Sequence, residues 1–253
     1  MMKIGDTLNF TWKLPVGLPA LAKDEVHVWR AQLDGSPMRV QELLSTLAPD
    51  ERERAGRFHF TKDRDRFIVA RGTLRSLLGL YLDREPGRLR FGYNPYGKPH
   101  LMEERHQDDL NFNLSHSHGL ALFAFTRAGK IGVDIERIRS DVSDERIAER
   151  FFSPQEVAGL RALPVALQAE AFFNCWTRKE AYIKGRGEGL SLPLDQFDVS
   201  LAPGEPAALL GTRIDGDETS LWSLQGLVPG PQFAAALAVE GHGWRLKCWQ
   251  WSH

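Results

Sequence analysis

The sequence predicts an α+β fold of two structurally similar lobes, related by a pseudo-twofold axis, with a cleft between them. Each lobe is expected to pack a small, mainly antiparallel sheet against a long helix. Three features support this prediction. Each half of the chain has one long helical pattern, one strand–turn–strand unit and one strongly apolar strand, in a similar order.

Equivalent elements of the two halves lie about 105–113 residues apart. We therefore expect an N-terminal lobe over 1–128 and a C-terminal lobe over 129–253. Clefts between lobes are preferred ligand sites, so the active site is expected between them. The alternative is that the element order repeats by chance, as it often does in α+β proteins.

The first half contains a helix over 63–82. Apolar residues recur three and four positions apart between Phe67 and Tyr81, which is the spacing of one helix face. Asn94-Pro95-Tyr96-Gly97 is a turn signal between two short strands. The strands expected in this half are 89–91, 98–101, 110–114 and 120–126, with residues 115–119 joining the last two.

The second half follows a similar order. Ser153 and Glu156 are typical of a capping box at a helix start, and Pro164 ends that helix. Gly185 marks the glycine-rich stop of the next helix, and Pro203-Gly204 indicates a hairpin. The elements expected here are a strand over 131–135, helices over 153–163 and 165–184, hairpin strands over 197–201 and 207–210, and a strand over 233–239.

Composition and charge indicate a globular protein. The 253 residues are 42% hydrophobic and 26% charged, with a formal net charge of −1, which argues against disordered and fibrous classes. The near-neutral balance argues against a general nucleic-acid coat and against a polybasic membrane protein. No apolar run approaches the roughly 20 residues of a membrane-spanning helix.

The N-terminus and the cysteines predict a cytoplasmic location. Asp6 stands where a signal peptide would have its hydrophobic stretch, so no secretion signal is expected. Cys175 and Cys248 are too few for a disulfide framework or a cysteine-based zinc site. The reduced cytoplasm is the simplest environment for such a chain.

The strand Gly132-Val133-Asp134-Ile135-Glu136 carries the first candidate site. Residues two apart on a strand face the same way, so Asp134 and Glu136 project together. Two adjacent carboxylates repel and favour a cation, and Mg²⁺ takes hard oxygen ligands together with substrate phosphates. The alternative is an ordinary solvated strand face.

The helix over 165–184 carries the second candidate. Trp176, Glu180 and Lys184 are spaced four apart and share one face. A carboxylate can ligate a metal or accept a proton, and a lysine one turn further can stabilise charge on phosphate oxygens. The alternative is a Glu–Lys surface pair worth a few tenths of a kcal/mol.

The segment Asn111-Phe112-Asn113-Leu114-Ser115-His116-Ser117-His118-Gly119 is the third candidate. A nucleophilic serine is rejected because no G-x-S-x-G elbow surrounds it, and zinc binding lacks further ligands. A phosphate cradle fits better, since hydroxyl, imidazole and turn N–H groups all donate to oxyanions. The alternative is a polar hairpin tip.

Arginines and lysines between residues 52 and 75 form the fourth candidate. Acidic residues are interleaved with them, which dilutes the field that a nucleic-acid backbone would need. A few arginines that hold one phosphate, or a salt-bridged surface, fit this pattern better.

Together these segments resemble the 4′-phosphopantetheinyl transferase superfamily, in its two-lobed Sfp type that activates peptide and polyketide synthases. The resemblance covers about residues 49–201. It rests on four motifs in order: Gly97-Lys98-Pro99, Phe112-Asn113-Leu114-Ser115-His116-Ser117, Gly132-Val133-Asp134-Ile135-Glu136, and Trp176-Thr177-Arg178-Lys179-Glu180-Ala181-Tyr182-Ile183-Lys184, extended by Gly187-Glu188-Gly189-Leu190.

The resemblance implies transfer of the 4′-phosphopantetheine group of coenzyme A to a serine hydroxyl of an apo acyl or peptidyl carrier protein, with release of adenosine 3′,5′-bisphosphate. It implies that Asp134, Glu136 and Glu180 hold Mg²⁺, with Mn²⁺ as the alternative ion. Glu180 is then the candidate base, directly or through a metal-bound water, and Lys184 stabilises the leaving phosphate. The residues implied for the 3′-phosphate and adenosine end of coenzyme A are Arg54, Arg66, Lys98, Ser115 and His116.

One position departs from the family pattern. A basic residue is expected one helical turn before Arg54, where this chain has Glu51. The 3′-phosphate contact is therefore expected to be weaker or rearranged, with Arg52, Arg57 or Lys62 as substitutes.

Two other hypotheses remain open at this stage. One is a different metal-dependent phosphoryl-transfer enzyme, such as a nuclease, that uses the same carboxylates. The other is a non-catalytic carrier-binding protein. For the leading hypothesis we expect carrier protein and coenzyme A as partners, no nucleic acid, no membrane, and a monomer, because one chain builds the cleft.

Overall fold

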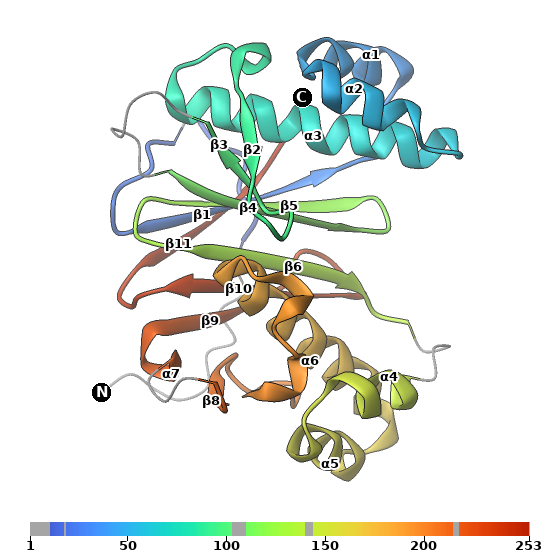
Figure 1. Cartoon of the computed structure of the whole chain (residues 1–253), viewed down its shortest axis with the longest axis vertical. Coiled ribbons are helices and arrows are strands. Elements are labelled where there is room, and N and C mark those ends of the chain that lie inside the picture. The colour runs from blue at the N-terminus through green and yellow to red at the C-terminus, as the bar shows by residue number, and fades with distance from the viewer. Residues whose placement is uncertain (1–10, 18, 103–109, 140–143, 215–217, 253) are drawn as a thin grey trace.

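The computed structural model describes residues 11–17, 19–102, 110–139, 144–214 and 218–252. These residues form four layers, with two stacked sheets in the middle and helices on both outer faces (Figure 1). The fold is therefore α+β, as predicted, and each half contributes most of one sheet and the helices that cover it. Asp6, on which the expectation of no secretion signal depends, lies outside the described residues.

The first sheet contains the last strand of the chain as well as strands of the first half. Its members are β1 (Glu25–Gln32), β4 (Asn111–Ser117), β5 (Leu120–Thr126) and β11 (Arg245–Gln250). The order is β11-β1-β5-β4, and β11 pairs in parallel with β1 while the other pairs are antiparallel. A boundary at residue 128 thus leaves one strand of this sheet in the other half of the sequence.

Helices cover the outer face of the first sheet. They are α1 (Pro37–Thr46), α2 (Pro49–Gly56), α3 (Thr61–Leu82) and the 3-10 turn η1 (Pro86–Arg88). The helix expected over 63–82 is confirmed by α3, whose Leu74, Leu77 and Leu78 are fully buried in one cluster with Trp29 and Phe123 of the sheet.

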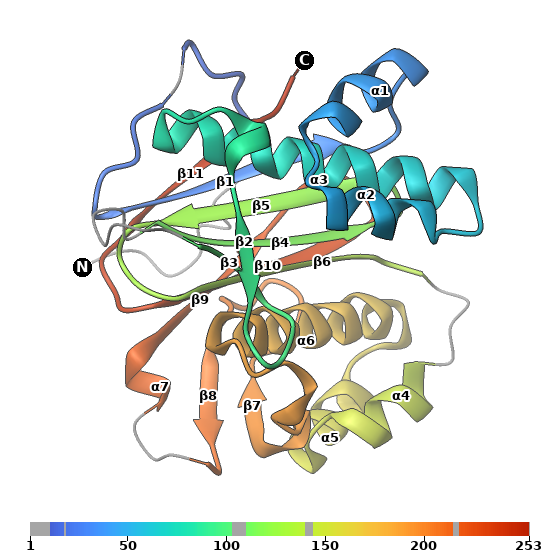
Figure 2. The ribbon, with the colours of Figure 1, turned by 45° about the horizontal axis from the view of Figure 1, so that its top comes forward.

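A small hairpin leaves this layer and runs toward the second half (Figure 2). It consists of β2 (Phe91–Tyr93) and β3 (Pro99–Leu101), paired antiparallel. The expected turn at Asn94–Gly97 joins the two strands, and Gly97 has a φ of 83°. The tip of this hairpin reaches the functional site described below.

The second sheet has the order β6-β10-β9, with all pairs antiparallel. The members are β6 (Ile131–Arg137), β9 (Trp222–Leu227) and β10 (Phe233–Glu240). The remaining elements of this half are α4 (Asp144–Phe151), α5 (Pro154–Ala162), α6 (Val165–Arg186), α7 (Glu218–Leu221), η2 (Gly189–Ser191), η3 (Leu194–Gln196) and the hairpin β7 (Phe197–Val199) and β8 (Leu209–Thr212). The capping box of Ser153 and Glu156 is confirmed. The helix α6 runs two residues beyond the expected end at residue 184: it continues through Gly185 to Arg186, and Gly187, with a φ of 82°, ends it. No helix in the described part of the chain is long and apolar enough to cross a membrane.

The two sheets face each other across one apolar core. Val28 and Leu122 of the first sheet share a buried cluster with Val133, Ile135 and Leu237 of the second. Because helices cover the other face of each sheet, the strands β5 and β10 are buried on both sides, which explains their near-continuous apolar character. This apolar core joins the two halves and fixes the position of one sheet relative to the other.

The strand β4 is longer than the sequence predicted. Residues 115–119 were expected to join two strands, but β4 continues to Ser117 and only His118 and Gly119 form the turn. Both turn residues have positive φ, 49° and 88°, which suits a two-residue hairpin. The polar sequence hid this part of the strand, because its side chains face the edge of the other sheet rather than an apolar core.

A buried polar group lies on β1 beneath α3. The ring of His27 is completely buried, and its Nδ1 lies 2.7 Å from the hydroxyl of Tyr81. Since Trp29 Nε1 donates to that hydroxyl at 2.7 Å, Tyr81 donates to Nδ1. The hydrogen of His27 is therefore on Nε2, where Glu25 accepts it at 3.2 Å. Both ring nitrogens are thus satisfied, and burial keeps the imidazole neutral.

We expect His27 to make the fold sensitive to acid. Burial lowers its pKa from 6.5 to about 4, although the Glu25 carboxylate opposes that shift. The unfolded chain therefore takes up a proton first, so stability is complete above pH 6.5 and falls by about 3 kcal/mol as the pH falls to 4. Urea unfolding of the wild type and of His27→Gln at pH 7 and pH 4.5 checks this. An unchanged pH dependence in the variant contradicts it.

Candidate active site

The site forms where β6 crosses α6. Gly132 lies at the crossing, and a Cβ atom there would be 2.0 Å from the carbonyl oxygen of Ala181 and 2.3 Å from the amide nitrogen of Gly185. Such distances exclude any side chain, so glycine lets the two backbones touch. The contact brings Asp134, two residues along the strand, next to Lys184 on the helix.

Asp134 is the centre of the site. Its carboxylate is almost fully buried, and its Oδ1 accepts hydrogen bonds from Ser115 Oγ at 2.8 Å and from Lys184 Nζ at 2.5 Å. The other oxygen, Oδ2, is also buried but has no hydrogen-bond partner. A buried carboxylate oxygen without a partner is costly, which indicates that a further cation or donor belongs beside it.

Side chains of β4 join the edges of the two sheets at this point. Asn113 Oδ1 accepts from Val133 N at 2.9 Å. Ser117 Oγ donates to Glu136 Oε2 at 2.8 Å and accepts from Arg137 N at 3.2 Å. Together with Ser115, these residues form one face of β4 and fix the carboxylates of β6. The strand alternation expected for Asp134 and Glu136 is confirmed, but their face is a seam between sheets rather than a solvated surface.

The charges of the site depend on one another. Burial raises the pKa of Glu180 to about 7, and the carboxylates of Asp134 and Glu136 shift it in the same direction. Burial likewise raises the pKa of Glu136. For Lys184, burial opposes the ammonium form, but the ion pair with Asp134 outweighs this effect and its pKa is raised. One lysine is therefore surrounded by three carboxyl groups, which leaves the pocket short of positive charge.

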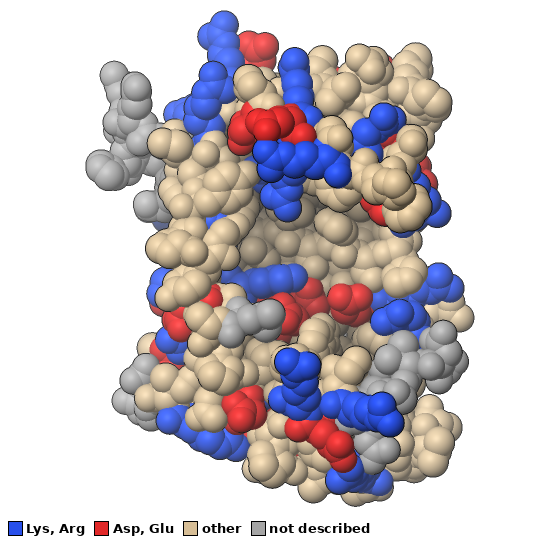
Figure 3. Space-filling view, turned by 45° about the vertical axis from the view of Figure 1, so that its right-hand side comes forward, with Lys and Arg blue, Asp and Glu red and all other residues tan. Residues whose placement is uncertain are grey.

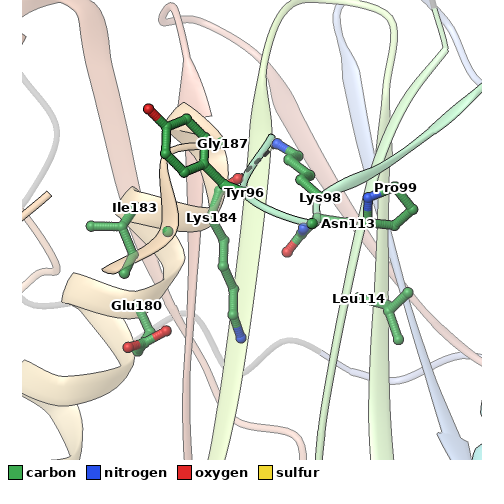
Figure 4. A pocket seen from close by; sticks show the side chains of 11 residues that line it. Tyr96, Lys98, Pro99, Asn113, Leu114, Glu180, Ile183, Lys184 and Gly187 are labelled. Carbon is green, nitrogen blue, oxygen red and sulfur yellow. Dashed lines mark hydrogen bonds between the residues drawn. The ribbon is translucent and has the colours of Figure 1, made fainter. Parts of the chain in front are cut away.

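Two adjoining pockets share Glu180 and Lys184. One, of about 410 Å³, is lined by Leu114, Ser115, His116, Asp134, Glu136, Trp176, Glu180 and Lys184. The other, of about 280 Å³, lies toward the β2–β3 hairpin, and Figure 4 shows its lining residues from α6, β4 and that hairpin. Figure 3 shows acidic side chains across the middle of one face of the molecule, beside a hollow, with basic side chains on either side.

The residues expected to hold coenzyme A are spread over three places. Ser115 and His116 lie in the larger pocket, with Ser115 bonded to Asp134 and His116 exposed at the rim. Lys98 lines the smaller pocket, but its Nζ donates to three backbone carbonyls. Arg66 makes two hydrogen bonds to Asp34, at 2.7 and 2.9 Å, beside the turn at Gly119.

Arg54 contacts an aromatic ring rather than the pockets. Its guanidinium lies over the ring of Phe67, 5.3 Å from the centroid, and it lines neither pocket. Arg52, one of the expected substitutes for a basic residue at position 51, donates to the carbonyls of Leu47 and Ser45. Arg57, another, pairs with Glu53 at 2.5 Å on the surface.

The donor set suits a divalent cation, although it is not assembled around one. Among the residues that the structure describes, no three His, Cys, Asp or Glu side chains stand close enough to hold a metal ion. The Oδ2 atom of Asp134 nevertheless has no hydrogen-bond partner and can accept a cation. Glu136 and Glu180 line the same pocket. Hard carboxylate oxygens are the ligands that Mg²⁺ prefers. The chemistry of these residues therefore fits such an ion.

Asn113 and Ser117 belong to the third candidate segment, but sequence reasoning gave neither residue a role of its own in the site. Both lie two residues from Ser115, so a longer β4 would have placed them on the same face.

Sequence reasoning also did not explain why position 51 is acidic. Glu51 is buried and accepts hydrogen bonds from Arg71 Nε, from Arg75 Nε at 2.6 Å and from Ala48 N at 2.8 Å. Its carboxylate therefore joins α2 to α3 and is a structural residue.

We expect Glu51→Lys to unfold the N-terminal half rather than improve phosphate binding. The substitution leaves two buried guanidinium groups without a counter-ion and adds a third cation, which costs about 3–5 kcal/mol. Thermal and urea unfolding check the loss. Asp50→Lys makes the same charge change at the neighbouring exposed position and is expected to unfold almost as the wild type does. Equal stability of the two variants contradicts this role of Glu51.

Comparisons with known proteins show which family this chain resembles. The family model for the 4′-phosphopantetheinyl transferase superfamily matches residues 130–238, and the model for the N-terminal part of 4′-phosphopantetheinyl transferase matches residues 31–127. The chain is 43% identical to 4′-phosphopantetheinyl transferase HetI of Nostoc sp., over 96% of this chain and all of that protein. It is 36% identical to 4′-phosphopantetheinyl transferase Sfp of Bacillus subtilis, over 64% of this chain and 69% of that protein.

A solved structure gives a partial match. Helicobacter pylori holo-[acyl-carrier-protein] synthase, in complex with coenzyme A, aligns with 44% of this chain and 99% of its own, at 23% identity and a TM-score of 0.33. The family models and the full-length relative cover both halves and every carboxylate of the site. On these matches, the chain belongs to the 4′-phosphopantetheinyl transferase superfamily.

Proposed function

We propose that this chain transfers the 4′-phosphopantetheine group of coenzyme A to a serine hydroxyl of an apo acyl or peptidyl carrier protein. The serine oxygen forms a bond to the β-phosphorus of coenzyme A, the pyrophosphate bond breaks, and adenosine 3′,5′-bisphosphate leaves. The serine proton passes to a base. The observation that carries the proposal is Asp134, a buried carboxylate with one free oxygen, in one pocket with Glu136, Glu180 and Lys184.

A divalent cation belongs to this proposal. Asp134, through Oδ2, together with Glu136 and Glu180, would hold Mg²⁺, with Mn²⁺ as the alternative. When bound, the ion neutralises charge on the pyrophosphate oxygens. Ser115 and Ser117 keep the two strand carboxylates oriented for it, through their hydrogen bonds to Asp134 and Glu136.

Glu180 is the proposed proton acceptor. Its pKa of about 7 lies near neutral pH, where a general base works best. Lys184 remains an ammonium group because its pKa is raised, and it lines both pockets. It would stabilise the charge that develops on the leaving phosphate. Trp176 packs against Phe172 at 6.2 Å between ring centroids and keeps this face of α6 in place.

The nucleotide end of coenzyme A is proposed to lie along the first half, near the end of β4. His116 stands at the pocket rim, where desolvation by the surrounding protein and the Lys184 ammonium lower its pKa, so a neutral ring can donate one hydrogen bond to a phosphate. Arg66 lies beside the adjacent turn, and its partner Asp34 is exposed, so a phosphate can replace this weak surface pair. Arg54 is a further cation, and Ser115 contributes through Asp134.

The setting of the reaction is also proposed. We expect the chain to act as a cytoplasmic monomer on a carrier protein and coenzyme A, with neither nucleic acid nor membrane as a partner. The proposed lobes, 1–128 and 129–253, have their boundary between the two regions matched by the family models. The strand β11 then belongs to the second lobe by sequence and to the first by pairing.

The intact mass of the carrier tests the proposed function. An apo carrier domain is incubated with the protein, coenzyme A and Mg²⁺. A second sample also contains EDTA, and a third contains a nucleic-acid duplex in place of the carrier. A gain of one phosphopantetheine group, lost with EDTA, is expected. No gain with several carriers, despite a folded enzyme, overturns the proposal. Cleavage of the duplex instead supports the nuclease hypothesis.

A further inference from the structure

The tip of the β2–β3 hairpin has an ordered backbone. Asn94 Oδ1 accepts hydrogen bonds from Tyr96 N at 3.0 Å and from Lys98 N at 2.8 Å, and Asn94 N donates to Lys98 O at 3.0 Å. Gly97 closes the turn with its positive φ. This loop, residues 94–98, is therefore shaped by its own hydrogen bonds before any ligand is considered.

The loop caps the end of α6. Lys98 Nζ donates to Lys184 O at 2.7 Å and to Gly185 O at 3.1 Å, and Asn94 Nδ2 donates to Gly187 O at 2.6 Å. The last carbonyls of a helix have no partner within it, and they carry the negative end of the helix dipole. An ammonium group is a favourable partner for them. Figure 4 shows Lys98 reaching from the hairpin to this helix end.

The same ammonium also binds the strand that crosses the helix. Lys98 Nζ donates to Ile131 O of β6 at 3.0 Å, next to the contact between Gly132 and α6. An ammonium group has three hydrogens, and all three are directed at backbone carbonyls. Lys98 lines a pocket beside Glu180 and Lys184, but its hydrogens are already used within the protein. Burial lowers the pKa of the Lys98 ammonium group to about 8. A carboxylate partner would oppose this shift, so the lowered pKa agrees with backbone carbonyls as the partners of Lys98.

We propose that Lys98 is a positioning residue that fixes the end of α6 against β6, and through it Lys184 and Glu180 against Asp134. In this role it touches neither coenzyme A nor the reacting atoms. The inference rests on the proposed transfer activity. It differs from the expectation that Lys98 holds the nucleotide end of coenzyme A, and the two roles predict different effects of the same substitution.

Lys98→Met tests the role, because methionine has a similar length and no donors. We expect kcat for transfer to fall roughly 100-fold, as misplacement of catalytic groups by about 1 Å does, while the Kd for adenosine 3′,5′-bisphosphate changes less than about threefold. Lys98→Arg, which keeps donors toward the carbonyls, is expected to recover part of kcat. Lys130→Met is the matched control, since Lys130 is an exposed lysine of the same region that pairs with Glu240, and it should behave as wild type.

A second variant covers the case in which Lys98→Met does not fold. Asn94→Asp keeps the acceptor that shapes the loop and replaces the donor to Gly187 O with a carboxylate oxygen, which repels that carbonyl. It is expected to lower kcat about tenfold with an unchanged nucleotide Kd. Circular dichroism melting of each variant accompanies the kinetics.

The outcomes separate the possibilities. A low kcat with an unchanged Kd in either variant supports the positioning role. A Kd for adenosine 3′,5′-bisphosphate that rises tenfold or more in Lys98→Met overturns it in favour of direct nucleotide contact, and wild-type values for both variants overturn it as well. Transfer by the wild type and by Lys130→Met shows that the proposed function holds. Failure of the proposed function would abolish transfer in these two proteins as well, and it is thereby distinguished from failure of the positioning role.

Discussion

Glu180→Gln is expected to reduce transfer to carrier protein by about 10²–10⁴-fold and to leave the fold intact. Glutamine has almost the same volume and still fits the half-buried position on α6. It cannot accept the serine proton, and it removes one of the three negative charges that the pocket offers to a cation. Stability should not fall, because burial already disfavours the charge of Glu180 and raises its pKa to about 7.

Glu170→Gln is the control for this prediction. Glu170 lies on the same helix, is exposed and lines neither pocket, so the substitution removes the same charge from α6 at a distance from the site. Initial rates at saturating coenzyme A and carrier, together with melting curves, provide the comparison. Wild-type turnover by Glu180→Gln would remove Glu180 from the mechanism.

Gly132→Ala is expected to destabilise the protein by about 3 kcal/mol or more and to abolish activity in the fraction that still folds. A methyl group at this position would overlap the carbonyl oxygen of Ala181 and the backbone of Gly185. Backbone atoms of a packed helix cannot rotate away as a side chain can, so β6 and α6 must separate. This separation moves Asp134 away from Lys184. In the wild type, Oδ1 of Asp134 lies 2.5 Å from Nζ of Lys184.

Gly226→Ala on β9 is the control for the strand itself. A Cβ atom at Gly226 would meet nothing within 4 Å, so alanine there should be neutral or slightly stabilising. Urea unfolding of both variants measures the difference. If Gly132→Ala is as stable and as active as Gly226→Ala, the backbone contact does not build the site.

The sequence predicted most elements because their local signals agree with their packing. The helices α3 and α6 have clear apolar spacing and end at recognisable residues, and α5 begins at a capping box. The strand β11 had no such signal. Its partner, β1, lies more than 200 residues earlier in the chain, and nothing in either segment indicates a parallel pair. Pairing over that distance depends on the packing of the whole chain.

The candidate site was predicted to a similar extent. Asp134, Glu136, Glu180, Ser115 and Lys184 were expected together, and the structure places them in one pocket. The positions of Lys98 and Glu51 were not predictable, because their partners are backbone carbonyls and arginines that sequence spacing does not reveal. A motif can identify a residue, but the hydrogen bonds it forms depend on which elements the fold brings beside it.

The most direct test of the transfer mechanism measures both products of one reaction. Holo-carrier and adenosine 3′,5′-bisphosphate are quantified together by mass spectrometry and chromatography, with wild type, Glu180→Gln and no enzyme. The proposed mechanism predicts that wild type forms the two products in equal amounts, with the added group on a carrier serine, and that Glu180→Gln forms neither at a comparable rate. Nucleotide release without holo-carrier, or holo-carrier formation that does not depend on Glu180, would contradict it.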